Sequence, residues 1–314
     1  MKLTNLSKKD FENILENYSI GKYKSHKYIF TGGNTIYKIT TTKGKFIVKI
    51  YETASTAFVK YQIRLMKFLK KTKVSTPKII DTKNKQGLLV WNKKRIAVQE
   101  FVRGKEAQYL DKELAKDLAK KCGLLDKILL KFKERQDSGW DDNQFKLVKW
   151  KTKNLFGMNL HKESKNLLKE IKKLNKKKLQ RGLIHGDLCE SNFLAENNKV
   201  TAIIDWDDAR EDYLVYEVAV PIAHNLTTRK EARKEVIKTF MKEYQKHIKL
   251  NNEERKALYL FVKYRQLDGG LWSYNQIKQH RDRKDELMSW TKIMIQKYNT
   301  FNKLSLKEFL ELLK

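Results

Sequence analysis

Cysteine is scarce in this sequence: Cys122 and Cys189 are the only two among 314 residues. Two cysteines so far apart predict neither a disulfide framework nor a zinc motif, and they favour a reducing compartment. Long apolar stretches are missing too, since no run reaches the 18 residues that a membrane-spanning helix requires. The first residues also lack the apolar stretch and cleavage site of a signal peptide, so we expect a cytoplasmic location.

Acidic residues are outnumbered, with 37 Asp and Glu against 68 Lys and Arg, which gives a net charge of +31. Such a charge attracts nucleotides, nucleic acids and anionic membrane surfaces. The lysines, however, occur in every predicted helix and lack the interleaved aromatic residues of a base-stacking platform. We therefore interpret the charge mainly as solvated helix faces. A nucleic-acid partner is the less favoured interpretation, and the sequence leaves the oligomeric state open.

Short segments with strand character dominate the first hundred residues. They predict strands over 28–31, 35–41 and 45–51, followed by a helix over 55–71. Further segments up to residue 101 complete an expected five-stranded sheet. A helix before the first strand is predicted to begin at Ser7, a capping residue with an acid three positions later.

Helical periodicity characterises much of the remaining chain. The predicted helices cover residues 111–135, 161–179, 229–247, 252–267, 284–298 and 306–313. Gly269 and Gly270 are expected to separate two helical segments. No internal repeat occurs, and no linker is long enough to split the chain further.

Three polar residues in the middle of the chain suggest a chemical site. Asp187 follows a short apolar segment and Gly186, which lets the chain turn sharply. Asn192 lies five positions after Asp187. A predicted hairpin turn at residues 197–198 returns the chain along a strand to Asp205. Asp187 could accept a proton from a hydroxyl group, while Asn192 and Asp205 could hold Mg²⁺ against phosphates. Phosphoryl transfer requires this combination of positioning and charge neutralisation. The competing interpretation of Asp187 is a turn or capping carboxylate.

These segments also resemble a known family. His185-Gly186-Asp187-Leu188, an asparagine five positions after the aspartate, and the segment from Ile204 to Ala209 resemble the motifs of aminoglycoside phosphotransferases and choline kinase-like proteins. That family also includes homoserine and hydroxylysine kinases. The resemblance implies an α+β, two-lobed protein-kinase-like fold. Residues 1–103 would form a small nucleotide-binding lobe with an antiparallel sheet and a helix, and 104–314 a large, mainly helical lobe for catalysis and acceptor binding.

The resemblance assigns roles to residues of the central motifs. Asp187 would be the catalytic base, with His185 beside it, more as a brace of the loop than as a base. Asn192 and Asp205 would hold Mg²⁺, and Asp207 would belong to the metal site or lie just behind it.

The resemblance also assigns the nucleotide site to the first lobe. A double-glycine loop would cover the phosphates, a strand lysine would contact them, and the backbone at the hinge between the lobes would meet the base. The residues concerned are Gly32, Gly33, Asn34, Lys49, Glu100 and Val102. Independently of the resemblance, the loop could be a plain hairpin turn and the lysine an ordinary edge-strand residue.

Two positions depart from the family pattern. The family has a glutamate in the helix after the lysine strand, where this sequence has Gln62, and the nearest acid is Glu52. The partner of Lys49 is therefore left open. Glu217 stands where the family has an aspartate, and we interpret it mainly as an acid at a helix N-terminus.

The combined pattern predicts an ATP-dependent phosphotransferase, with GTP as the alternative donor and Mg²⁺ as cofactor. It would move the γ-phosphate to a hydroxyl of a small molecule: an aminoglycoside, an amino sugar, choline or a homoserine-like amino alcohol. The positive charge of the chain argues modestly against a polycationic acceptor. The alternative hypothesis is a non-catalytic kinase-fold protein that holds an anionic partner on its basic surface.

Overall fold

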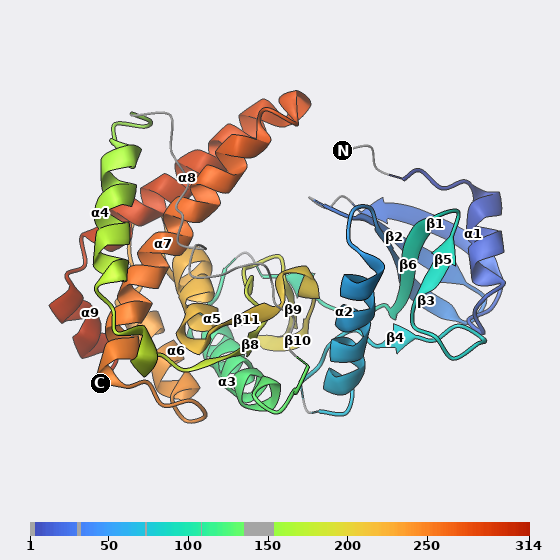
Figure 1. Cartoon of the computed structure of the whole chain (residues 1–314), viewed down its shortest axis with the longest axis horizontal. Helices are drawn as coiled ribbons and strands as arrows, with labels where there is room; N and C mark the ends of the chain where they lie inside the picture. Colours follow the sequence, from blue (N-terminus) through green and yellow to red (C-terminus); the bar gives the residue numbers. More distant parts are fainter. Residues whose placement is uncertain (1–3, 30–32, 73, 108, 135–153) are drawn as a thin grey trace. The chain divides into compact units, whose positions relative to one another are not determined.

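The computed structural model describes residues 4–29, 33–72, 74–107, 109–134 and 154–314. It divides the chain into two compact units (Figure 1). The first unit comprises Met1–Gly104 together with Thr201–Asp207, and the second comprises Lys105–Val200 and Asp208–Lys314. The short segment Thr201–Asp207 therefore joins the first unit from a distant part of the sequence.

The first unit is built on a six-stranded sheet. All its strand pairs are antiparallel, in the order β1-β2-β3-β6-β4, and β5 also pairs with β6. The strands are β1 Tyr23–Ile29, β2 Thr35–Thr41, β3 Gly44–Tyr51, β4 Ile79–Ile80, β5 Leu89–Trp91 and β6 Lys94–Glu100, with helices α1 Lys8–Leu15 and α2 Thr56–Leu69.

The sheet has one strand more than the five predicted, and its first strand begins earlier than residue 28. Strand β1 starts at Tyr23, and its five central side chains are exposed. An edge strand of this kind carries polar side chains on both faces, so it lacks the apolar alternation from which strands are predicted.

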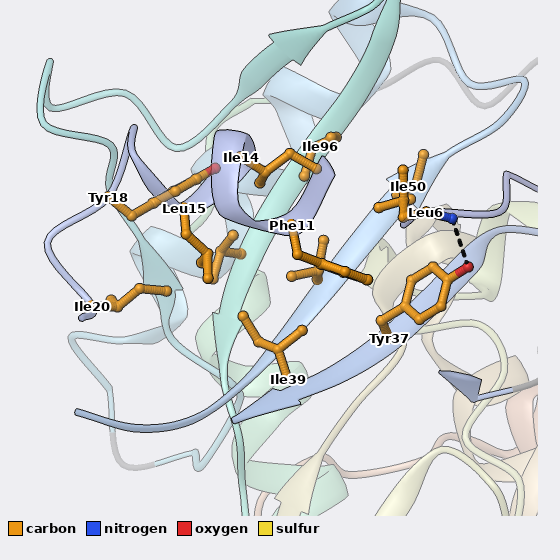
Figure 2. Close-up of a cluster of buried hydrophobic side chains, with 12 residues drawn as sticks. Leu6, Phe11, Ile14, Leu15, Tyr18, Ile20, Tyr37, Ile39, Ile50 and Ile96 are labelled. Atoms are coloured by element: carbon orange, nitrogen blue, oxygen red, sulfur yellow. Dashed lines mark hydrogen bonds between the residues drawn. The ribbon is translucent and has the colours of Figure 1, made fainter. Parts of the chain in front are cut away.

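The core of the first unit lies between α1 and one face of this sheet, as Figure 2 shows. Phe11, Ile14 and Leu15 of α1 pack with Ile39 of β2 and Ile50 of β3, all fully or almost fully buried. Helix α1 begins with the predicted capping box, in which Ser7 and Asp10 satisfy each other's backbone amides. Because side chains alternate along a strand, the residue before Ile50 lies on the opposite face of the sheet.

The second unit is mainly helical. Its helices are α3 Lys112–Leu129, α4 Leu160–Lys172, α5 Leu214–Pro221, α6 Lys234–Tyr244, α7 Asn252–Gln276, α8 Lys284–Asn302 and α9 Leu306–Leu312, with a π-helical segment η3 Ile222–Leu226 after α5. Its short strands are β7 Lys105–Glu106, β8 Arg181–Ile184, β9 Phe193–Glu196 and β11 Arg210–Tyr213. Strand β8 pairs with β11, and β7 pairs with β9.

The predicted hairpin turn after β9 is confirmed. Asn197 and Asn198 both adopt left-handed backbone conformations, with φ of 50° and 55°. Asparagine tolerates this region better than most residues, and two such residues in succession form a tight turn. The chain then returns along β10 Lys199–Ile203, which leads directly into the segment that carries Asp205.

The prediction that Gly269 and Gly270 separate two helices is wrong, because α7 runs through both without a break. A Cβ atom at Gly269 would lie 3.1 Å from the Met294 side chain of α8, and one at Gly270 would lie 3.4 Å from it. The glycines thus permit close packing of α7 against α8, and this tertiary contact overrides their poor intrinsic helix propensity.

Within the described ranges, no helix is both long and apolar enough to cross a membrane. Cys122 and Cys189 are both buried as free thiols.

The packing of α1 on the sheet yields a stability prediction. Phe11→Ala removes a fully buried ring from the core of the first unit, so we expect unfolding to require about 3–5 kcal/mol less free energy. Urea unfolding followed by circular dichroism measures the change. The matched control is Val90→Ala, since Val90 is 61% exposed, and its effect should stay within about 0.5 kcal/mol. Equal effects of the two variants would contradict the assigned core.

Candidate active site

The loop after β8 contains the predicted sequence His185-Gly186-Asp187. Gly186 has φ of +81°, and an added Cβ would collide with the Arg210 guanidinium and lie 2.8 Å from the Asp208 carbonyl oxygen. Both the backbone conformation and the available space therefore require glycine at this position. The sharp turn directs the chain from a buried strand to the partly exposed Asp187, whose side chain is 21% exposed.

Glu217 of α5 holds this loop in place through its side chain. Its carboxylate is fully buried and accepts hydrogen bonds from the backbone amides of His185, at 3.2 Å, and Gly186, at 2.9 Å. Burial raises the pKa of Glu217, although His185 and the two amides oppose this. Interpreting Glu217 mainly as a helix-terminal acid is therefore incomplete, because its side chain holds two consecutive amides of the loop.

The structure brings three of the predicted residues together in this loop. The Asn192 side-chain amide donates to both the carbonyl oxygen of Asp187, at 2.7 Å, and its Oδ2 atom, at 2.8 Å. The buried ring of His185 lies against the same residue, since its Nδ1 accepts from the Asp187 amide at 3.4 Å. These contacts fix the orientation of the Asp187 carboxylate.

Sequence reasoning missed one residue of this cluster. Arg265 of α7 forms an ion pair with Oδ1 of Asp187 through its Nη2 atom. No local motif marks Arg265, which lies 78 positions further along the chain. The signal available was a basic residue among the buried positions of a helix, and periodicity alone does not show which distant carboxylate it meets.

A second group of predicted residues meets around Lys49 in the first unit. The Lys49 ammonium is buried on the face of β3 away from the α1 core and lies 3.0 Å from Asp205 Oδ1 and 2.5 Å from Asp207 Oδ1. Burial alone would lower the pKa of Lys49, but the charges of Asp205 and Asp207 outweigh it and raise this pKa. The lysine is therefore a permanently charged group between two carboxylates.

The open question of the Lys49 partner is answered by Asp207. The Gln62 amide donates to Asp207 Oδ1 at 3.1 Å and to the Trp206 carbonyl oxygen at 3.0 Å, and Asn34 donates to Asp207 Oδ2 at 2.5 Å. A reversed Gln62 amide would place its oxygen against two acceptors, so this orientation is required. Glu52 instead pairs with Lys94 at 2.7 Å.

Fewer contacts are described for the other residues that were predicted to bind the nucleotide. Gly32 lies outside the described residues, and a Cβ at Gly33 would meet nothing within 4 Å. Glu100 ends β6 and Val102 follows it; Lys49 pairs in register with Ala97, three residues before Glu100. Of the two predicted hinge residues, Glu100 thus lies on the strand next to that of Lys49, and Val102 lies just beyond the end of that strand.

The donor set around Lys49 suits a hard divalent cation. Asp205 and Asp207 offer carboxylate oxygens, which Mg²⁺ prefers, and their side chains are 38% and 29% exposed. Asp205 has a left-handed backbone, with φ of 57°, which is uncommon for a residue other than glycine. The oxygen donors of the two carboxylates and their partial exposure therefore fit Mg²⁺.

The chain is similar in sequence to known proteins. A model described as "Phosphotransferase enzyme family" matches residues 31–259. A homoserine kinase of Gluconobacter oxydans (strain 621H) is 26% identical over 232 residues, which cover 69% of this chain and 71% of that protein.

Two solved structures resemble the chain over almost its whole length. The amicoumacin kinase hAmiN, in complex with AMP-PNP, Ca²⁺ and Ami, has a TM-score of 0.74 at 15% identity, covering 96% of each chain. A microcompartment-associated aminopropanol kinase has a TM-score of 0.74 at 15% identity, covering 98% of this chain and 100% of that one. These similarities confirm the predicted α+β, protein-kinase-like fold.

The contacts of Gln62 predict that a glutamate is harmful at this position. Gln62→Glu removes both hydrogen bonds and adds a third carboxylate beside Asp205 and Asp207, so we expect a loss of about 1–3 kcal/mol in the free energy of unfolding at pH 7. The crowded carboxylates raise the folded-state pKa of the new glutamate, so its ionisation costs stability above an unfolded pKa of about 4.3, and that part of the loss disappears at lower pH.

Urea unfolding at pH 7 and at about pH 4 measures this effect. Gln86→Glu makes the same chemical change at an exposed position of the same unit and serves as the control. A Gln62→Glu variant as stable at pH 7 as the control would show that Gln62 does not hold Asp207.

Proposed function

The chain belongs to the phosphotransferase enzyme family, and we propose that it transfers the γ-phosphate of ATP to a hydroxyl group of a small molecule. The observation that carries this proposal is the loop in which Gly186 presents Asp187 while Asn192 holds the carboxylate in one orientation. A positioned carboxylate of this kind is what a general base for an alcohol requires. ATP is the proposed donor, and GTP is the alternative that the same site would accept.

In the proposed step, the hydroxyl oxygen of the acceptor forms a bond to the γ-phosphorus. The bond between that phosphorus and the bridging β–γ oxygen breaks, and ADP leaves with the electron pair. The hydroxyl proton goes to the carboxylate of Asp187. An ionised carboxylate has about four acceptor positions, so its contacts with Asn192 and Arg265 leave room for the hydroxyl group.

The other predicted site residues take supporting roles in this proposal. Lys49 would contact the phosphates of the nucleotide, and the loop with Gly32, Gly33 and Asn34 would cover them. The backbone carbonyl of Glu100 and the amide of Val102 would form hydrogen bonds with the purine ring of the nucleotide.

Asn192 and Asp205 would hold Mg²⁺, with Asp207 beside them. Magnesium, when bound, neutralises phosphate charge. The Asn192 amide nitrogen donates to Asp187, so its Oδ1 atom, which accepts from the Ser191 hydroxyl at 3.3 Å, would be the group that faces a cation. His185 would brace the loop through its contact with the Asp187 amide.

The non-catalytic alternative loses its main argument. It rested on the missing glutamate partner of Lys49, yet Asp207 lies 2.5 Å from the lysine and is held there by Gln62 and Asn34. The chain therefore keeps a charged partner for this lysine, supplied from another segment.

Removing the proposed base should abolish turnover without abolishing nucleotide binding. Asp187→Asn keeps the shape of the side chain but cannot take up the proton, so we expect kcat to fall at least about 10²- to 10⁴-fold. ADP release is measured with a panel of amino alcohols and amino sugars, and nucleotide affinity is measured by calorimetry. Asp282→Asn, at an exposed position, is the control. Undiminished turnover in Asp187→Asn would refute the role of the base.

Removing a proposed metal ligand should weaken nucleotide binding mainly when magnesium is present. We expect Asp205→Ala to weaken the affinity for Mg-ATP by about tenfold or more, because carboxylate ligands supply much of the attraction for a hard cation. Affinity for ATP with EDTA should change far less. Calorimetric titration with and without Mg²⁺ separates the two, and Asp285→Ala, at an exposed position, is the control. An unchanged Mg-ATP affinity would exclude Asp205 as a ligand.

A further inference from the structure

A cluster of charged and polar side chains lies beside Asp187 within the second unit and is centred on His224. This residue belongs to the π-helical segment η3, which follows Pro221 at the end of α5. π-helical turns are rare and occur often at functional sites, because the extra residue shifts the side chains around the helix. His224 is 5% exposed and its neighbour Asn225 is 7% exposed.

The contacts of His224 fix its protonation. Arg265 Nε lies 3.1 Å from His224 Nε2, and a guanidinium can only donate, so Nε2 must accept and the proton must be on Nδ1. Burial lowers the pKa of His224, and the charge of Arg265 adds to this, although Glu190 opposes it. The ring is therefore neutral, and its Nδ1 faces Glu190 Oε2 at 3.4 Å.

Glu190 places a carboxylate beside this ring, with its Oε2 atom 3.4 Å from His224 Nδ1 and its side chain 21% exposed. Glu190 Oε2 makes no hydrogen bond of good geometry within the described part of the chain.

Lys297 of α8 completes the cluster and lacks a carboxylate partner. Lys297 as a whole is 8% exposed. Its ammonium donates to the carbonyl oxygen of His224, and among the described residues no carboxylate lies within ion-pair distance of it. Burial lowers the pKa of Lys297, opposed by Glu190. Both ends of the Asn225 side-chain amide are likewise without a hydrogen bond among the residues described. Buried charged and polar groups left in this state cost free energy unless a ligand satisfies them.

We infer that this cluster recognises a zwitterionic acceptor, an amino alcohol that also carries a carboxylate. The inference rests on the proposed function and names the substrate class of the same site. The acceptor ammonium would bind Glu190, its carboxylate would bind Lys297 together with Arg265, and its hydroxyl group would face Asp187. Arg265 already joins both parts, since it contacts Asp187 and His224 simultaneously.

The charges of the cluster disfavour the other acceptor classes. A polycation would meet two buried positive groups, Arg265 and Lys297, whereas a simple amine would leave Lys297 without a counter-charge. A hydroxy acid without an amine would leave Glu190 unpaired. A neutral sugar would satisfy neither charge, and only a zwitterion satisfies both.

A metal ion is a poorer occupant of the same cluster. Cys189, Glu190 and His224 offer ligand atoms within 4.8 Å of one another. However, the histidine atom that faces this group is the protonated Nδ1, which cannot bind a metal, and Arg265 and Lys297 repel a cation. Burial, with the neighbouring Asp187 and Glu190, raises the pKa of the Cys189 thiol, which keeps it protonated.

Three matched compounds test the inference on the full chain with Mg-ATP. Homoserine carries the ammonium, the carboxylate and the hydroxyl group; 3-aminopropan-1-ol lacks only the carboxylate, and 4-hydroxybutanoate lacks only the amine. We expect kcat/KM to be highest for homoserine and about 10- to 100-fold lower for each of the other two, as expected for one lost charge-assisted contact.

Two variants assign the contacts. Lys297→Met should bring the ratio of kcat/KM for homoserine to kcat/KM for 3-aminopropan-1-ol close to one. Lys297→Arg should restore most of this ratio. Glu190→Gln should lower the preference for homoserine over 4-hydroxybutanoate in the same way. Lys292→Met and Glu196→Gln, at exposed positions, are the matched controls and should leave both ratios unchanged. Thermal unfolding verifies that each variant is folded, and a purely structural role would not change the ratios selectively.

The possible outcomes separate the inference from the proposed function. Equal turnover of the three compounds, or preference for one of the two truncated ones, overturns the zwitterion site and leaves phosphotransfer intact. Loss of turnover in Lys297→Met without a change in the ratio also overturns it. If none of the three compounds is phosphorylated, the inference is wrong, and the ADP release assay with other acceptors decides separately whether the proposed function stands.

Discussion

Lys49 is a buried ammonium, and a charge in that position is tolerated only because carboxylates lie against it. Its main partner, Asp207, arrives from a segment more than 150 positions away in sequence and is oriented by two amides, those of Gln62 and Asn34. The short segment Thr201–Asp207 belongs to the first unit, and backbone and side-chain hydrogen bonds from Ile203 to Ser75 and from Thr201 to Arg103 also attach it there. The strand lysine therefore lies at a candidate phosphate site and pairs with carboxylates from a distant part of the chain.

The second unit also contains a buried ionisable group that is held by polar partners, with the roles of donor and acceptor exchanged. Here the buried group is a carboxylate, Glu217, and the partners are the backbone amides of His185 and Gly186. A loop made of backbone and glycine would otherwise be free to change conformation. Its anchoring gives Asp187 a defined position at the surface, where Asn192 and Arg265 then determine its orientation. Together these contacts hold the Asp187 carboxylate in one orientation, as the proposed role of a general base requires.

Much of the architecture could be predicted from the sequence, because local patterns determine it. The central motif placed Asp187 and Asn192 correctly beside each other, and the turn at Asn197 and Asn198 followed from the backbone preference of asparagine. The exposed edge strand β1 left no apolar pattern, and the glycines of α7 indicated a break that helix packing removes.

The partners of buried charges were harder to predict than the elements that carry them. Neither the role of Asp207 beside Lys49 nor that of Arg265 beside Asp187 has a local signature, because each depends on which distant segments meet. Composition likewise indicated only an excess of positive charge. It did not show that Lys297 is buried without a carboxylate nearby, since periodicity gives the face of a helix and not the chemistry of the surface that it meets.

The close contact between α7 and α8 connects these observations. Arg265 lies one helical turn before Gly269, and Lys297 lies one turn after Met294, the residue that packs on that glycine. The packing of the two helices beside these cations therefore depends on the absence of a side chain at one position. Any residue larger than glycine at 269 would require the Met294 side chain to move, although neither residue belongs to the proposed acceptor site.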